Sequence, residues 1–185
     1  MKEKLNNLEK TILLILLFSK NELYETDFIL YDLIFLINYQ TDKLNINDFE
    51  FHSYGIYSKK VSDALFKLIE KNYIELDDDI LILTYKSKKI IPFLLENTDK
   101  ELLESIKENV NLFNDLNLFE ILTYLYYKYP EYFNNIKRLK IIEKNKEKLA
   151  LNLYKKNKIS LNALSEILNI PIEKTINLLK EKNLI

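Results

Sequence analysis

The chain of 185 residues contains no cysteine, no tryptophan, one glycine, one histidine and three prolines. Without cysteine it can form no disulfide bond and no thiolate metal site. A glycine-rich phosphate loop needs several glycines and a histidine zinc site needs several histidines, so both are excluded. His52 is the only histidine that could activate a nucleophile, and the carboxylates show no spacing that singles out a catalytic pair. We expect a protein that is not an enzyme and binds no cofactor or metal.

Long apolar runs are also absent. The longest covers residues 12–18, seven residues where about 20 are needed to cross a bilayer. The first ten residues lack the pattern of a signal peptide. The sequence therefore predicts a soluble, cytoplasmic protein that does not contact a membrane.

The scarcity of glycine gives asparagine a special role. Asn enters the left-handed backbone region more readily than most residues with a side chain, so we expect Asn at helix ends and tight turns. A chain this poor in Gly and Pro has no flexible linker. Helices or tight turns should join its parts.

Charge is divided unevenly along the chain. Residues 136–185 carry twelve Lys and Arg against five Asp and Glu, a formal charge of +7, whereas residues 1–135 carry −8. The whole-chain value of −1 hides this division. A basic segment points to an acidic partner, with nucleic acid the first candidate.

Helical periodicity covers most of the chain. The clearest amphipathic helix follows Ser58, a credible N-cap, with apolar residues at Val61, Ala64, Leu65, Leu68 and Ile69. We expect Thr26 to cap an earlier helix over residues 27–39, and Thr84 to cap a later one. Other predicted helices cover residues 5–19, 99–115, 117–129 and 136–156. Residues 47–57 are expected to be extended or a short helix with a turn.

Two β-prone runs, 73–76 and 80–83, flank three aspartates and predict a β-hairpin. Three helices followed by a hairpin are typical of a winged helix. The predicted fold class is mainly α: a winged-helix-like domain with one small β-hairpin, further helices and a C-terminal helix-turn-helix. We expect the winged-helix-like domain over 1–97, a helical connector over 98–142 and the helix-turn-helix over 143–185. The aspartates, Asp77 to Asp79, favour a plain turn over a cation site.

The only glycine lies in an aromatic motif over residues 49–58, Phe-Glu-Phe-His-Ser-Tyr-Gly-Ile-Tyr-Ser. This motif resembles the F-x-F-x-x-Y-x-Y-G-P-Y-S signature of the YwgA-like proteins, related to the SocA-like antitoxin or Panacea domain. The apolar runs 13–18 and 32–37 are similar to two helices of that family, and Leu83-Thr84 to its L-T-x-x-G. The likeness covers about residues 8–97. It differs at Ile56, where the signature has Pro. The stretch from Phe51 to Gly55 is also two residues shorter than in the signature.

The resemblance implies a winged-helix-like domain found in regulators and in antitoxin-type proteins that act through protein contacts. It implies no catalytic residues. From the sequence itself, we expect Gly55 to adopt a positive φ where the chain turns towards the helix after Ser58.

Residues 160–179 carry the spacing of two helices that cross at a tight turn. Ser160 is the expected cap of the first helix, and small Ser165 should allow close approach of the second. Asn169 takes the turn position usually held by Gly, and Pro171 begins the second helix. The expected inward residues are Leu161, Leu164, Leu168, Ile170, Ile176 and Leu179.

In a DNA-binding helix-turn-helix, early exposed residues of the second helix touch base edges. Together with the preceding basic segment, this predicts contacts from Lys174, Thr175, Asn177, Lys180, Lys137, Arg138, Lys140 and Lys144. The alternative is a solvated face of a protein-interaction module, since Glu173 and Glu181 lie beside these lysines. The aromatic run 124–133 is explained by helix packing and receives no site.

The predicted function is a non-enzymatic DNA-binding regulator of transcription type, whose acidic N-terminal domain binds a protein partner or forms a homodimer. Three aspartates at the hairpin tip would repel phosphate, which favours protein contacts for that domain. The alternative is an antitoxin-like or adaptor protein in which both parts bind other proteins.

Overall fold

The computed structural model describes residues 5–20, 23, 28–52, 55–133 and 139–185. It is mainly helical, with small two-stranded antiparallel hairpins. The chain divides into two compact units, Met1–Asp115 and Leu116–Ile185. This division differs from the predicted boundaries after residues 97 and 142. No helix in the described ranges combines the length and apolar character that a membrane span requires.

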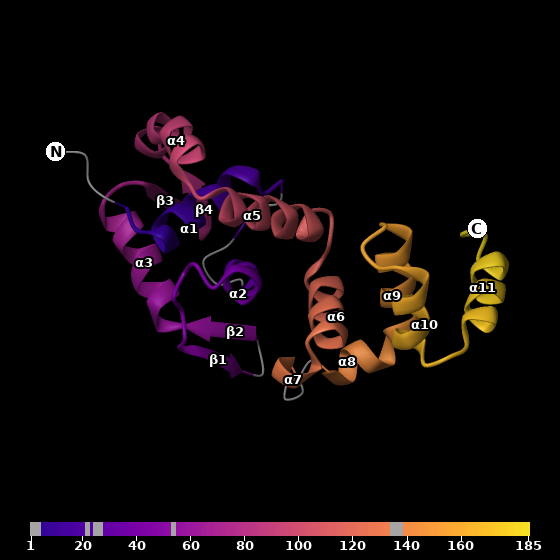
Figure 1. Cartoon of the computed structure of the whole chain (residues 1–185). Coiled ribbons are helices and arrows are strands. Elements are labelled where there is room, and N and C mark those ends of the chain that lie inside the picture. Colours follow the sequence, from indigo (N-terminus) through magenta and orange to yellow (C-terminus); the bar gives the residue numbers. More distant parts are fainter. Residues whose placement is uncertain (1–4, 21–22, 24–27, 53–54, 134–138) are drawn as a thin grey trace. The chain divides into compact units, whose positions relative to one another are not determined.

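The core of the first unit is built on α1 (Asn7–Phe18) and α2 (Ile29–Thr41), shown in indigo and violet in Figure 1. Four consecutive residues of α1, Ile12 to Ile15, have no exposed surface. Since four consecutive residues point to all sides of a helix, the middle of α1 is buried all round. Helix α5 (Lys100–Phe113) packs on both α1 and α2 and therefore belongs to this unit.

The predicted hairpin is confirmed: β3 (Ile74–Asp77) pairs antiparallel with β4 (Ile80–Leu83). Asp78 and Asp79 form the turn, with φ values of 47° and 66°. Positive φ at both central residues is the geometry that matches the twist of a two-residue hairpin. The three aspartates thus have a structural role as strand end and turn. Helix α4 (Tyr85–Asn97) follows, with Thr84 as its cap.

A second hairpin corrects the prediction of only one. Strand β1 (Phe49–His52) pairs antiparallel with β2 (Gly55–Ser58), in the segment expected to be extended or a short helix. Phe49 and Phe51 each set a ring edge-on against Phe35 of α2, at centroid distances of 5.4 and 5.5 Å. This aromatic packing attaches the hairpin to the core.

Gly55 has the predicted positive φ, 151°, but it lies in β2 and pairs with His52. A Cβ atom at this position would lie 2.6 Å from the Cβ of Phe28. The position therefore requires glycine both for its backbone conformation and for the close approach of Phe28. The predicted cap Thr26 lies outside the described residues, and α2 starts after Phe28 without a side-chain cap.

Helix α3 (Lys59–Glu70) begins at Ser58, as predicted. The buried Ser58 hydroxyl accepts a hydrogen bond from the Val61 backbone N–H at 3.3 Å and donates to Asp48 Oδ1 at 2.7 Å. The other oxygen of Asp48 accepts from the Lys60 backbone N–H at 3.0 Å. Two side chains thus satisfy two of the N–H groups left open at the start of the helix.

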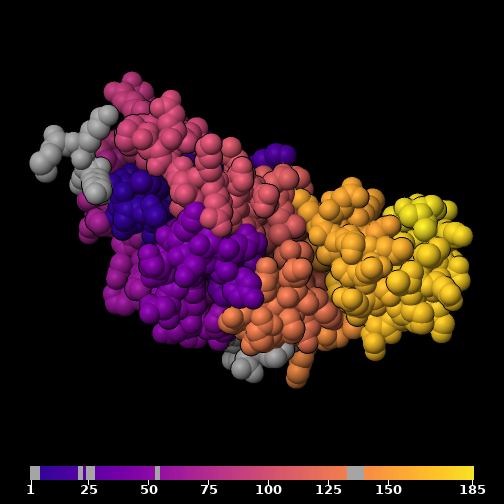
Figure 2. Space-filling view, in the orientation of Figure 1, coloured from indigo at the N-terminus to yellow at the C-terminus, as the bar shows by residue number. Residues whose placement is uncertain are grey.

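The second unit contains only helices among its described residues: α6 (Leu118–Lys128), α7 (Pro130–Phe133), α8 (Leu139–Lys144), α9 (Lys146–Lys155), α10 (Leu161–Leu168) and α11 (Ile172–Glu181). Ala150 and Leu151 of α9, Leu164 and Ile167 of α10 and Leu179 of α11 form a buried cluster. In the space-filling view these three helices, orange to yellow, form one packed body (Figure 2).

Asparagine ends several of the helices. Asn72, Asn157, Asn169 and Asn183 all have φ between 54° and 58°. After each, a backbone N–H returns to a carbonyl five residues earlier, as from Ile170 to Ser165 and from Leu184 to Leu179. This is the helix-ending motif that usually contains glycine, so the predicted role of asparagine is confirmed. Asn145 also separates α8 from α9, where the sequence predicts one continuous helix.

Candidate functional site

The turn between α10 and α11 sets the direction of the last helix. Ser160 caps α10 as predicted, its hydroxyl accepting from the Ala163 N–H at 3.2 Å. Asn169 adopts the left-handed conformation, and the buried Ser165 hydroxyl donates to the carbonyl of Ile170. Pro171 stands just before the first residue of α11. The local geometry thus agrees with the predicted positions of the turn residues.

Helix α11 presents one polar face to solvent. Lys174, Asn177 and Lys180 are all exposed, as the sequence predicts. Glu173 and Glu181 are exposed as well, so the charges on this face nearly cancel. The face therefore offers donors and acceptors but little net attraction for an anion.

The structure corrects the prediction that Thr175 is an exposed site residue. Its side chain has no exposed surface, and its hydroxyl donates to the Pro171 carbonyl at 3.2 Å. Thr175 and Leu179, four residues apart, form the buried stripe of α11, while Ile176 is only half-buried. Because the hydroxyl is satisfied within its own helix, Thr175 can lie in the core, where it contacts no ligand.

The predicted basic residues before α9 divide into two sets. Lys140 and Lys144 lie on α8 and are exposed. Lys137 and Arg138 lie outside the described residues. Lys144 lines a surface depression together with lysines of α9 and of the segment after α11.

Sequence reasoning identified the basic character of this region but missed the groove that gathers its lysines. Lys148 and Lys155 of α9 and Lys182 after α11 line the same groove as Lys144. The spacing of Lys144, Lys148 and Lys155 by four and seven residues is a helical stripe that the sequence displays. Helical periodicity cannot predict that Lys182 lies beside this stripe, because its position there depends on how α11 packs.

The aromatic run of α6 contributes to packing, as predicted. Tyr127 lies against the helical core of the second unit, and its hydroxyl donates to Glu143 Oε1 at 3.1 Å. Burial raises the pKa of Tyr124 to about 12. Both tyrosines line a smaller hollow beside the start of α10, together with Lys128 and Lys158. Tyr127 is thus held in place by packing between helices.

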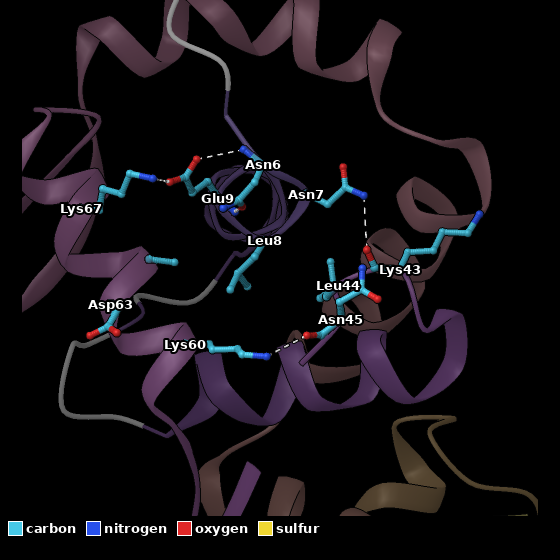
Figure 3. Close-up of a pocket in the computed structure, with 11 residues that line it drawn as sticks. Asn6, Asn7, Leu8, Glu9, Lys43, Leu44, Asn45, Lys60, Asp63 and Lys67 are labelled. Atoms are coloured by element: carbon cyan, nitrogen blue, oxygen red, sulfur yellow. Dashed lines mark hydrogen bonds and ion pairs between the residues drawn. The ribbon is translucent and has the colours of Figure 1, made fainter. Parts of the chain in front are cut away.

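A pocket of the first unit also contains lysines, but its charges are paired (Figure 3). Lys67 Nζ lies 2.5 Å from Oε1 of the buried Glu9, whose other oxygen accepts from the Asn6 N–H. Lys60 donates to the Asn45 carbonyl at 3.1 Å. Lys43 extends away from the other labelled residues and pairs with Asp99 and Glu101, which raise its pKa.

Lysines on the exposed side of α3 also have partners within the first unit. Lys59 pairs with Asp63 one turn later at 2.8 Å, and Lys60 and Lys67 have the partners given above. With a formal charge of −7 over residues 1–115 against +6 over residues 116–185, the first unit offers less for an anion than the second. The candidate site is therefore the basic second unit.

No protein-family model, no curated protein and no solved structure matches this chain.

Proposed function

We propose that the chain is a non-enzymatic regulator that binds duplex DNA through its second unit, with α10 and α11 acting as a helix-turn-helix. The observation that carries the proposal is the exposed polar face of α11, with Lys174, Asn177 and Lys180, on a unit of charge +6. In such motifs the second helix enters the major groove, where an Asn side chain can pair with adenine. The unit's excess positive charge attracts the phosphates.

Within this proposal the first unit is a winged-helix-like domain for a protein partner or a second copy of the chain. Its support is the order α1, α2, β1–β2 hairpin, α3 and β3–β4 hairpin, in which a hairpin follows the third helix, together with the motif that resembles the YwgA-like and SocA-like proteins. The aspartates at the tip of the β3–β4 hairpin oppose phosphate, which favours a protein over DNA as the partner of this unit.

One observation favours a second candidate function. Glu173 and Glu181 lie on the same exposed face as Lys174 and Lys180, and a balanced face is ordinary for protein interaction. In that case the chain is an antitoxin-like or adaptor protein whose two units both bind proteins. A stoichiometric partner recovered from native extract that stays bound at high salt favours this candidate.

The test is fluorescence anisotropy of a labelled duplex with the full chain at 50 mM salt. We expect Lys174→Glu and Asn177→Ala each to weaken binding by tenfold or more. Lys100→Glu makes the same charge reversal at an exposed position of the first unit and should leave binding within a factor of two. Equal affinity for all four proteins contradicts the assignment of α11 as the contacting helix.

A further inference from the structure

A groove in the second unit lies between α8–α9 and the segment that follows α11. Its volume is about 430 Å³. The groove is lined by Lys144, Asn145, Glu147, Lys148, Leu151, Asn152, Lys155, Lys182 and Leu184. Two leucines contribute apolar surface and every other lining residue is polar or charged, so the groove is suited to a charged ligand.

Most of its lysines lack a partner among the described residues, unlike the lysines that line the pocket of the first unit. In the part of the chain that the structure describes, no carboxylate lies within ion-pair distance of Lys144, Lys148 or Lys155. Lys182 pairs with Glu147, the only acidic residue of the lining, at 3.5 Å. Four lysines against one glutamate leave a formal charge of +3. The groove therefore has cations available for an incoming anion.

The arrangement of these cations favours an extended anion over a compact one. Lys148 and Lys155 are seven residues apart on α9, which separates them by about 10 Å along the helix axis at 1.5 Å per residue. Phosphates of one DNA strand follow each other every 3.4 Å or so along the duplex axis. Two lysines separated by this length, with Lys144 lining the same groove, match a run of phosphates better than one isolated phosphate.

Polar side chains in the groove add hydrogen-bonding capacity. Asn152 lies one turn after Lys148 on the same face of α9 and carries a half-buried amide that can donate to a phosphate oxygen. The amide nitrogen of Asn145 is already committed to the Ile141 carbonyl at 2.9 Å. Asn152 is thus the amide that can orient a phosphate between the lysines.

We propose that this groove holds the phosphate backbone of the bound duplex, through Lys144, Lys148, Lys155 and Asn152. The inference rests on the proposed DNA-binding function and deepens it: the lysines of α8 and α9 attract the phosphates, while the balanced face of α11 lies against the bases. Lysine alone cannot read a sequence through phosphates, so the groove contributes affinity and not specificity. A soluble polyphosphate has the same chemistry and is the competing source of phosphate.

The experiment is a salt titration of duplex binding with the full chain. Removing three phosphate contacts makes the negative slope of log K against log salt less steep, by about 0.9 for each contact or about 2.7 in total. We therefore expect the triple variant Lys144→Gln, Lys148→Gln, Lys155→Gln to have a slope less steep than that of the wild type by about 2–3. The matched variant Lys88→Gln, Lys100→Gln, Lys107→Gln removes the same charge from the first unit and should keep the wild-type slope. Circular dichroism and thermal unfolding check that both variants fold.

The outcomes separate the groove from the function on which it rests. If the wild type binds and the groove variant keeps its slope while Lys174→Glu loses affinity, the groove proposal fails and the DNA-binding proposal stands. If the wild type binds no duplex at 50 mM salt, the DNA-binding proposal fails. Calorimetry with inorganic tripolyphosphate then decides the ligand: binding that the groove variant loses overturns the backbone assignment in favour of a soluble polyphosphate.

Discussion

The Nζ atom of Lys182 lies 3.5 Å from Oε1 of Glu147, which joins the end of α11 to α9 across the basic groove. Both side chains are more than half exposed, at 51% and 57%. Exposed pairs of this kind contribute little to stability, typically below about 1 kcal/mol. The pair matters more for charge, because Glu147 is the only acidic residue among those that line the groove.

Glu147→Gln should therefore strengthen duplex binding without stabilising the fold. A unit charge within several Å contributes at most about 1 kcal/mol in water, so we expect up to about fivefold tighter binding at 50 mM salt. The gain should disappear at high salt, where the charge is screened. Anisotropy measures the change, and Glu108→Gln in the first unit is the charge-matched control. Weaker or unchanged binding by Glu147→Gln, relative to the control, speaks against anion contact in the groove.

Ser58→Ala should destabilise the first unit. The hydroxyl is buried, caps the Val61 N–H and donates to Asp48, so its removal leaves one backbone donor open and one carboxylate oxygen without its donor. We expect the free energy of unfolding to fall by about 1–2 kcal/mol. Urea denaturation followed by circular dichroism measures this value. Ser58→Thr, which keeps a hydroxyl, should recover part of the loss, and no difference between Ala and Thr contradicts the capping role.

The Asp48 carboxylate should make stability depend on pH. Burial raises its pKa, but the hydrogen bonds from the Ser58 hydroxyl and the Lys60 N–H outweigh burial and hold the pKa below the ordinary value of 3.8. A lowered folded-state pKa stabilises the fold above the unfolded-state pKa, and the contribution is lost as pH falls through the folded-state pKa. The stability difference between wild type and Asp48→Asn should thus be constant above about pH 5 and shrink towards pH 2. A difference that stays constant over this range refutes the coupling.

Asn169 is the position where the turn between α10 and α11 depends on one backbone conformation. Its φ of 55° suits Asn or Gly but strains a β-branched residue. Asn169→Gly should change the free energy of unfolding by only a few tenths of a kcal/mol, whereas Asn169→Val should cost about 1–2 kcal/mol and weaken duplex binding in parallel. Thermal unfolding and anisotropy on the two variants make the comparison. Equal stability of Gly and Val would show that the turn does not require the left-handed conformation.

Local features of the fold follow closely from the sequence. Capping by Ser58, Thr84 and Ser160, and the left-handed asparagines, depend only on neighbouring backbone groups, so residue type and position suffice to predict them. The β1–β2 hairpin was missed because its stability comes from aromatic contacts with Phe35, a residue distant in sequence. Local pattern carries no signal for such a contact.

The same difference between local and distant contacts decides which parts of the candidate site the sequence predicts. Lys174, Asn177 and Lys180 fall on the exposed side of α11 as their periodicity predicts. Thr175 was misplaced because its polarity suggested exposure, whereas the Pro171 carbonyl satisfies its hydroxyl inside the core. Lys182 meets the lysines of α9 only through tertiary packing between α9 and α11, which are separated in the sequence by α10. No spacing rule could predict this contact.

The salt dependence of duplex binding by the unmodified full chain is the decisive measurement for the DNA-binding proposal. We predict detectable duplex binding at 50 mM salt. Log K should fall linearly with log salt at a slope between about −3 and −6, as expected for about three to six phosphate contacts. An absence of duplex binding at 50 mM salt, or an affinity that does not change between 50 and 300 mM, contradicts it.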